Sequence, residues 1–260
     1  VRPGDDIATL VAVATDVRSG DVLVVTQKIV SKAENRLVAV DADDPFSHKA
    51  LVEEESVRVL RRRGDLVISE TEHGFVCANA GVDRSNLDDG TAALLPRDSD
   101  RSARRIRDRL RDATGAEVGV IVSDTFGRPW RRGLVDVAIG CAGVAAVVDL
   151  RGTEDATGHE LQVTEVAVAD EIAAAAELVM GKADGVPVAI VRGLDPVTDT
   201  EIALLLASAH LRAGDHHAAH VLLPLPPSAT PDPPERVRTS QSWATRCIQV
   251  PVLDSSCPPK

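Results

Sequence analysis

The chain has 260 residues and a mass of 27.5 kDa, which suits one large domain or two small ones. With 40 Asp and Glu against 29 Lys and Arg, its net charge is −11, so phosphate would repel it and a role as a general nucleic-acid binder is excluded. Aromatic residues make up only 2% and Tyr is absent, which argues against base stacking. We expect no membrane partner, because no apolar run approaches the roughly 18 residues of a span.

The four cysteines are scattered along the chain, at Cys77, Cys141, Cys247 and Cys257. They form no CxxC pair and no dense framework, so neither a zinc ribbon nor a disulfide scaffold is predicted. The first residues also lack a basic region followed by an apolar stretch, and no secretory signal is expected. These features favour a cytoplasmic protein.

The composition changes near residue 195, which predicts a domain at 1–194 and a tail at 195–260. Ten of the 15 prolines lie at or beyond Pro196, and four of the seven histidines fall within 210–220. Such proline density prevents strands and long helices. We expect a short helix at 199–212 and a mostly disordered Pro/His-rich remainder.

Residues 1–194 alternate between helical and strand-like patterns, as in an α/β or α+β domain. In chain order we expect a helix at 5–17, strands at 21–26 and 35–40, a helix at 45–63, strands at 66–70 and 74–78, a helix at 99–114, strands at 118–122 and 145–150, a helix at 166–180 and a strand at 186–191. The helix at 99–114 is rich in Arg, but Asp residues are interleaved and the arginines avoid its apolar stripe. We interpret this as a solvated helix face and not as a phosphate site.

Two polar segments come where ligands could bind. In 26–35, directly after a strand, Lys28 and Lys32 are four residues apart, and two ammonium groups on one helix face would suit a polyphosphate, although solvated lysines are an equal alternative. In 78–86, Asp83 and Asn86 could hold a metal and a phosphate oxygen, or could simply make a turn or a helix cap.

The segment 123–133 is the densest in functional residue types. Asp124 and Thr125 follow the strand expected at 118–122, and a carboxylate with a hydroxyl at such a place is typical of Mg²⁺ sites in phosphoryl transfer. A polar surface turn is the alternative. Together with Asp83, these oxygens favour Mg²⁺ or Mn²⁺ over zinc. The chain contains no Walker loop and no GxSxG elbow.

Five segments occur in the order known from one family: TQKIVSKAENR at 26–36, HGFVCANAGVDRSN at 73–86, VSDTFGRPWRRG at 122–133, DLRGTEDATG at 149–158 and VADEIAAAAELVMGKADGVPVAIVRG at 168–193. The chain thereby resembles the coenzyme F420-0:γ-glutamyl ligase family, whose domain in actinobacteria often forms the N-terminal part of a longer protein. The resemblance implies an α+β fold with mixed β-sheets and packed helices, and an intertwined homodimer.

The activity implied is GTP-dependent ligation of L-glutamate to a deazaflavin precursor, first at its lactyl carboxylate and then through γ-linkages. An acyl phosphate would be the intermediate. The implied cofactors are GTP as co-substrate, Mg²⁺ or Mn²⁺, and K⁺ as a further candidate. The partners would be the deazaflavin precursor, L-glutamate and a second copy of the chain.

The resemblance also carries roles onto residues of this sequence. The implied metal ligands are Asp83, Asp124 and Thr125. The expected GTP contacts are Gln27, Lys28, Lys32, Asn86 and Lys182. Some relatives place an acidic metal ligand where Lys182 stands, so we expect Lys182 to reach a phosphate instead. Arg128 and Arg131 are candidates for contacts with anionic substrates. No general base is assigned, although the acids Glu165, Asp170 and Glu171 are available.

Two departures leave alternatives open. Relatives begin with a Gly-Leu-Pro segment upstream of 2–6 that contributes to the nucleotide site, and its absence before Val1 predicts weaker GTP binding. Residues 195–260 match neither a usual family ending nor a nitroreductase domain. The first alternative function is therefore a catalytically impaired module that binds deazaflavin or nucleotide, and the second is a metal-dependent phosphatase or kinase.

Overall fold

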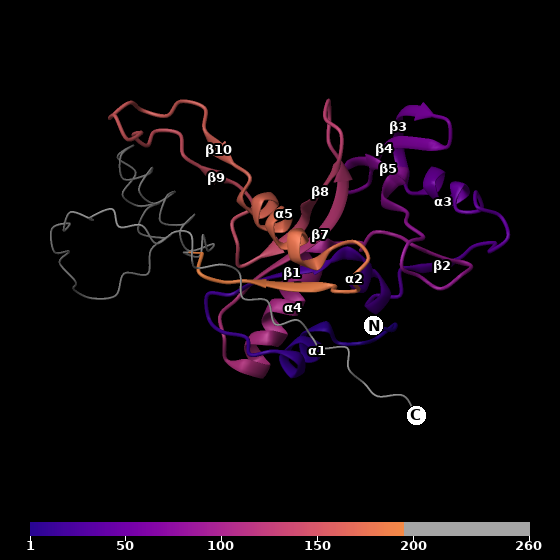
Figure 1. Ribbon diagram of the computed structural model, residues 1–260, viewed down its shortest axis with the longest axis horizontal. Coiled ribbons are helices and arrows are strands. Elements are labelled where there is room, and N and C mark those ends of the chain that lie inside the picture. The colour runs from indigo at the N-terminus through magenta and orange to yellow at the C-terminus, as the bar shows by residue number, and fades with distance from the viewer. Residues whose placement is uncertain (195–260) are drawn as a thin grey trace.

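A mixed four-stranded sheet lies at the centre of the structure, a computed structural model that describes residues 1–194 (Figure 1). Its order is β11–β1–β7–β8. The strands are β1 (Val22–Thr26), β7 (Gly119–Gly127), β8 (Leu134–Ala142) and β11 (Val188–Val191). β1 and β7 run parallel, whereas β11 and β8 are antiparallel to their neighbours. The helix expected at 199–212 and the rest of the tail lie outside the described residues.

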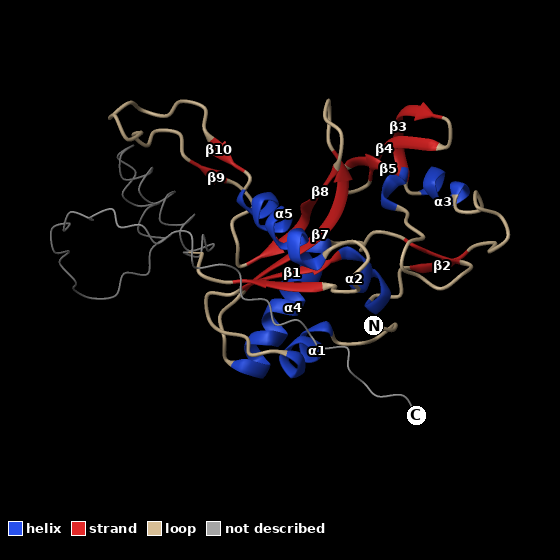
Figure 2. Cartoon of the chain, in the orientation of Figure 1, coloured by secondary structure: helices blue, strands red, loops and turns tan. Residues whose placement is uncertain are grey.

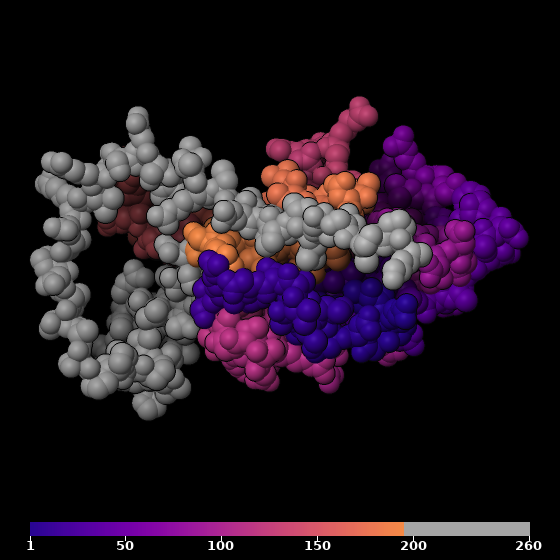
Figure 3. All heavy atoms as spheres, turned by 60° about the horizontal axis from the view of Figure 1, so that its bottom comes forward, coloured from indigo at the N-terminus to yellow at the C-terminus, as the bar shows by residue number. Residues whose placement is uncertain are grey.

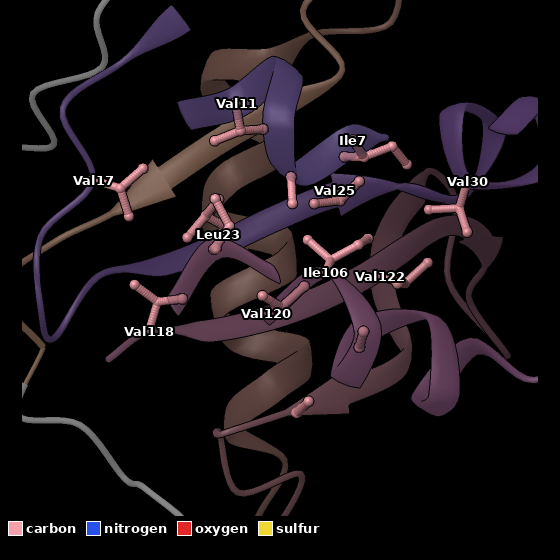
Figure 4. Close-up of a cluster of buried hydrophobic side chains, with 14 of the residues drawn as sticks. Ile7, Val11, Val17, Leu23, Val25, Val30, Ile106, Val118, Val120 and Val122 are labelled. Carbon is pink, nitrogen blue, oxygen red and sulfur yellow. The ribbon is translucent and has the colours of Figure 1, made fainter. Parts of the chain in front are cut away.

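Helices cover both faces of this sheet (Figure 2). One face carries α1 (Ile7–Ala14), α2 (Gln27–Ala33) and α4 (Ser99–Thr114), and the other carries α5 (Val168–Met180). Because successive strand residues point to opposite faces, Leu23 and Val25 of β1 join the first hydrophobic cluster, while Val22 and Val24 join the second. The continuous apolar run of β1 thus reflects burial on both sides. Figure 4 shows the first of the two clusters, with Leu23 and Val25.

The Arg-rich helix α4 packs as its sequence predicts. Asp98 caps it by accepting a hydrogen bond from the Arg101 amide, and Gly115 ends it at φ 74°. Ala103, Ile106 and Leu110 are buried. Arg105 and Arg109 are about half exposed, which agrees with the predicted solvated face, and they also form ion pairs with Glu34 and Asp6 that the sequence did not predict.

Smaller sheets lie beside the central one (Figure 1). A three-stranded sheet contains β3 (Ser56–Arg63), β4 (Leu66–Thr71) and β5 (Val76–Ala78), with α3 (Lys49–Glu54) before it and the 3₁₀ turn η1 (Asn79–Gly81) after it. β2 (Leu37–Ala39) pairs with β6 (Thr91–Ala93). β9 (Val148–Asp149) and β10 (Glu165–Val166) form the base of a long arm.

Most expected elements are confirmed, and the mixed sheets with packed helices agree with the fold implied by the resemblance. The helix expected at 45–63 is wrong: α3 ends at Glu54, and β3 follows. Val57 and Val59 alternate there with arginines, and the strand pairs with β4. The arginines that suggested a helix C-terminus instead lie on an exposed sheet edge, where charge opposes pairing with other chains.

Two strand boundaries also need correction. The strand expected at 145–150 comprises only Val148–Asp149. The strand that pairs with β7 is β8, which was not predicted. β7 itself continues to Gly127, so Asp124 lies within a strand and not just past its end. The reason is the β7–β8 hairpin, whose backbone pairing extends both strands through polar sequence. Among residues 1–194, no helix has the length and apolarity to cross a membrane.

Candidate functional site

A cavity of about 530 Å³ opens at the edge of the central sheet where the parallel strands β1 and β7 reach their carboxyl ends. This is the edge at which sheets of this kind bind ligands. The walls come from β1 and α2, the segment after η1, the β7–β8 hairpin and the connection from α5 to β11. Segments more than 150 residues apart in the sequence, such as Gln27 and Lys182, therefore meet here.

Most residues predicted for the site line this cavity. They are Gln27, Lys28, Lys32, Asp83, Asn86, Asp124, Thr125 and Lys182. Arg128 and Arg131 do not: they lie exposed in the turn between β7 and β8, where the Arg128 guanidinium donates a hydrogen bond to the Arg132 carbonyl. This turn stands out from the body of the molecule (Figure 3). A contact of these two arginines with substrate remains a prediction.

Asp83 and Lys28 form an ion pair at one wall. The Lys28 ammonium is 2.5 Å from Asp83 Oδ2 and also donates to the carbonyl and hydroxyl of Ser85, at 2.6 and 2.7 Å. Two backbone hydrogen bonds with Ala93 hold Asp83 in place. Burial acts to raise the pKa of Asp83, but the bonds from Lys28 and Ser85 outweigh it and hold this pKa below its ordinary value.

Asp124 is placed by a β-bulge. Val122 pairs with Gly140 but Ser123 pairs with Ala138, so Ile139 is an extra residue in β8. Such bulges re-aim the side chains that follow. Asp124 Oδ1 accepts a hydrogen bond from the Thr125 amide at 2.8 Å. Burial raises the pKa of Asp124 to about 7, and the charges of Asp83 and Asp136 act in the same direction.

The sequence reasoning missed Asp136, which lies opposite Thr125 on β8. Its side chain is only 3% exposed. It accepts hydrogen bonds from the hydroxyls of Ser123 (3.0 Å) and Thr125 (2.5 Å). The alternation of Val135, Val137 and Ile139 around it was a strand signal that could have placed Asp136 beside the Asp124 segment.

Lys182 and Asn86 close the opposite side. The Lys182 ammonium lies 3.3 Å from Asp136 and 3.5 Å from Glu177, a second cavity residue that was missed because no sequence signal distinguishes it from other polar residues of α5. The Asn86 amide approaches the Lys182 carbonyl at 3.5 Å, and Lys32 donates to the Asn86 carbonyl at 3.1 Å. These contacts join the loop at 83–86 to both α2 and the end of α5.

Gln27 lines the cavity, but its side-chain amide is used in hydrogen bonds within the protein. The buried Gln27 amide donates to Ser31 and to the Leu94 carbonyl, which ties α2 to the end of β6.

The three acids available as a base lie elsewhere. Asp170 accepts a hydrogen bond from the Ala138 amide, and Glu165 forms an ion pair with Arg151 at 3.4 Å. Neither these two acids nor Glu171 belongs to the described lining of the cavity, so none is assigned as a base.

The donor set fits a hard divalent cation shared with a ligand. No cluster of three or more His, Cys, Asp or Glu residues within 1–194 is arranged to hold a metal by itself. Asp83, Asp124 and Thr125 nevertheless offer oxygen atoms on one cavity. Mg²⁺ is typically held by one or two carboxylates together with water and phosphate oxygens. The mutual repulsion of Asp83, Asp124 and Asp136 would be relieved by such a charge.

Fold and site together define an α+β protein with a polar cavity that combines carboxylates and ammonium groups at a sheet edge. Within that class, the chain belongs to the F420-0:gamma-glutamyl ligase family, whose pattern matches residues 1–193. It is 47% identical over 211 residues to the Coenzyme F420:L-glutamate ligase of Methanopyrus kandleri, covering 75% of this chain and 84% of that protein.

Two further relatives carry the same name. The protein of Methanothermobacter thermautotrophicus is 47% identical over 214 residues, covering 74% of this chain and 84% of the relative. That of Methanocaldococcus jannaschii is 41% identical over 194 residues, covering 68% and 77%. The residues matched by the family pattern, 1–193, include every segment that lines the cavity.

Proposed function

We propose that this chain is a ligase that joins L-glutamate to the deazaflavin F420-0, with GTP and Mg²⁺ or Mn²⁺ as the remaining requirements. The observation that carries the proposal is the family match over residues 1–193, within which four of the five segments that carry the resemblance contribute residues to one cavity. The names of the relatives support the substrate pair. The scattered cysteines support a cytoplasmic location.

The proposed reaction has two steps. A carboxylate oxygen of the precursor attacks the γ-phosphorus of GTP, which forms an acyl phosphate and releases GDP. The glutamate amine then attacks the acyl carbon, so that a C–N bond forms, the C–O bond to phosphate breaks, and the amine loses a proton. Phosphoryl transfer requires mainly positioning and neutralisation of charge, and a bound divalent cation would supply both at the phosphate oxygens.

The residues of the cavity suit these requirements. All the reactants are anions and the chain carries a net charge of −11, so cations must be concentrated locally. Lys28, Lys32 and Lys182 bring three ammonium groups to the cavity walls. Asp83, Asp124 and Thr125 would hold the metal, and Asn86, between Lys32 and Lys182, is placed for the nucleotide.

A homodimer is part of the proposal. Apolar side chains are exposed together on the β3–β5 sheet, and Trp130 and Leu134 are exposed on the β7–β8 hairpin. In the sheet they are Val57, Val59, Leu60, Leu66 and Val76. Such groups of exposed apolar residues are typical of interaction surfaces, and a second copy of the chain is the partner that the family resemblance implies.

Mass spectrometry of the precursor after incubation with protein, GTP, L-glutamate and Mn²⁺ tests the activity. We expect products that each differ by one glutamyl unit and that are absent without GTP; reactions with ATP in place of GTP test the choice of nucleotide. Precursor that binds but is never extended would favour the impaired module. Phosphate release that does not need glutamate would favour a phosphatase or kinase.

A further inference from the structure

Asp136 is the most buried carboxylate among the residues that line the cavity. Hydroxyls hold both of its oxygens: Ser123 donates to Oδ2 and Thr125 donates to Oδ1. The Lys182 ammonium lies 3.3 Å from Oδ1 and balances the charge. Two hydroxyls from the same face of β7 therefore fix the plane of this carboxylate.

The consequence falls on the Thr125 hydroxyl. A threonine hydroxyl has one hydrogen to donate and two lone pairs that accept. The Thr125 hydroxyl donates its hydrogen to Asp136, with 2.5 Å between Thr125 Oγ1 and Asp136 Oδ1. The lone pairs of Thr125 Oγ1 are therefore free for a ligand in the cavity that Thr125 lines. Without an acceptor at this point, the hydroxyl could rotate and present its hydrogen to an incoming cation, which would oppose binding.

We propose that Asp136 is a positioning residue that keeps the Thr125 oxygen turned toward a divalent cation. The assignment rests on the proposed function, because it requires the cation to bind beside Thr125. Asp136 is not itself placed as a ligand, since both its oxygens already accept hydrogen bonds and its side chain is almost wholly covered. Outer partners of this kind commonly change metal affinity about 10- to 100-fold.

Binding of Mn²⁺ to the full chain, with and without GDP, tests the assignment. The electron paramagnetic resonance of free Mn²⁺ is the readout, and GDP alone is the reference for Mn²⁺ held by the nucleotide. We expect Asp136→Ala to weaken Mn²⁺ binding about 10- to 100-fold. Asp136→Asn keeps an oxygen that can accept from Thr125, so its affinity is expected to stay close to that of the unmodified chain. This rescue by a neutral side chain would not occur if Asp136 were a ligand through its charge.

Thr125→Val and the double variant with Asp136→Ala supply the second measurement. If Asp136 acts through Thr125, the double variant binds Mn²⁺ as weakly as the weaker single variant and no more weakly. Asp100→Ala is the matched control, because it also removes a carboxylate that anchors β8, by accepting from the Cys141 amide. It should bind Mn²⁺ like the unmodified chain.

Three results would overturn the assignment: unchanged affinity in Asp136→Ala, losses that multiply in the double variant, or an Asn variant as weak as the Ala variant. If Asp136→Ala does not fold, the comparison of Asp136→Asn with Thr125→Val replaces it. Equal losses of Mn²⁺ affinity in these two variants would count against the assignment, because only Thr125→Val is expected to weaken binding. Failure of the unmodified chain to bind Mn²⁺ even with GDP present would overturn the proposed metal dependence together with the assignment. Normal Mn²⁺ binding by the unmodified chain with any of the three results above would overturn the assignment alone.

Discussion

Two carboxylates of the cavity, Asp83 and Asp124, have opposite electrostatic environments. Asp83 is bonded to Lys28 and Ser85, which hold its pKa below the ordinary value against the effect of burial. Asp124 is half-buried, and desolvation together with the charges of two neighbouring carboxylates raises its pKa to about 7. The charge on Asp124 therefore destabilises the metal-free folded protein, and a cation bound beside it would stabilise that charge.

Asp124→Asn should reduce metal-dependent turnover at least about 100-fold, because a metal contributes several kcal/mol of charge stabilisation in such reactions. The measurement is the rate of glutamyl product formation at saturating Mn²⁺. Asp112→Asn, on the exposed side of α4, removes the same charge away from the cavity and should leave the rate unchanged. Wild-type turnover in the Asp124 variant would remove this residue from the site.

The same substitution should stabilise the metal-free protein. The folded pKa of about 7 exceeds the ordinary 3.8, so in wild type the folded state binds the proton more tightly and loses stability as pH rises between these values. Asp124→Asn lacks this loss. In EDTA, the Tm of the variant should exceed that of wild type above pH 7, and the difference should vanish as the pH falls toward 3.8. A variant that melts lower than wild type at pH 8 would contradict this.

At the scale of elements, the β7–β8 hairpin carries much of the site. Its bulge directs Asp124, Thr125 and Asp136, and its other end supports α4. At Gly140, β8 passes close to the start of α4. A Cβ at this position would lie 2.4 Å from the Ser99 carbonyl carbon and 2.6 Å from the Asp100 amide nitrogen. Both are backbone atoms at the start of α4, which a side-chain rotation cannot relieve.

Gly140→Ala should therefore destabilise the fold by about 1–3 kcal/mol or more, the usual cost of overpacking. Urea unfolding of the metal-free protein measures it. Gly127→Ala lies on the same hairpin, and a Cβ there meets nothing within 4 Å, so that variant should unfold nearly like wild type. Equal stability of the two variants would show that α4 can move away from the strand.

At the scale of the whole molecule, an acidic protein must bind anionic reactants. The net charge of −11 repels the proposed reactants at a distance, and among residues 1–194 the cations that offset this at the cavity are Lys28, Lys32 and Lys182. Exposed apolar side chains occur on β3, β4, β5 and the β7–β8 hairpin, and also on α1 and α5. Of these we select the side chains of the β3–β5 sheet and the hairpin. They are the surface that we propose the second copy covers.

Sedimentation equilibrium should give twice the 27.5 kDa mass of one chain. Leu60→Asp, on the exposed face of β3, should shift the protein toward one chain, because burying an unpaired charge in an interface is costly. Val13→Asp places the same charge at a more exposed position, on α1, and should keep the dimer. A single-chain mass for wild type, or dissociation of both variants alike, would argue against this interface.

The sequence by itself determined the elements with strong local periodicity, such as α4 and β1, because their apolar residues recur at the spacing of one buried face. It failed at 45–63 and at β8, where strand formation depends on backbone pairing with the neighbouring strand of a hairpin, which local periodicity does not report. The three polar segments at 26–35, 78–86 and 123–133 were likewise recognisable from their residue types. Each contributes residues to the cavity, although the tip at 128–133 does not.

Only the tertiary structure decided which of these residues meet and in which orientation. The bulge at Ser123, the burial of Asp136 and the convergence of Lys182 with Asn86 depend on pairing between β7 and β8 and on the position of the α5–β11 connection. Local sequence patterns report the preference of each segment for helix or strand. Distances between segments, and the pKa shifts that follow from them, arise only when the chain packs into a common core.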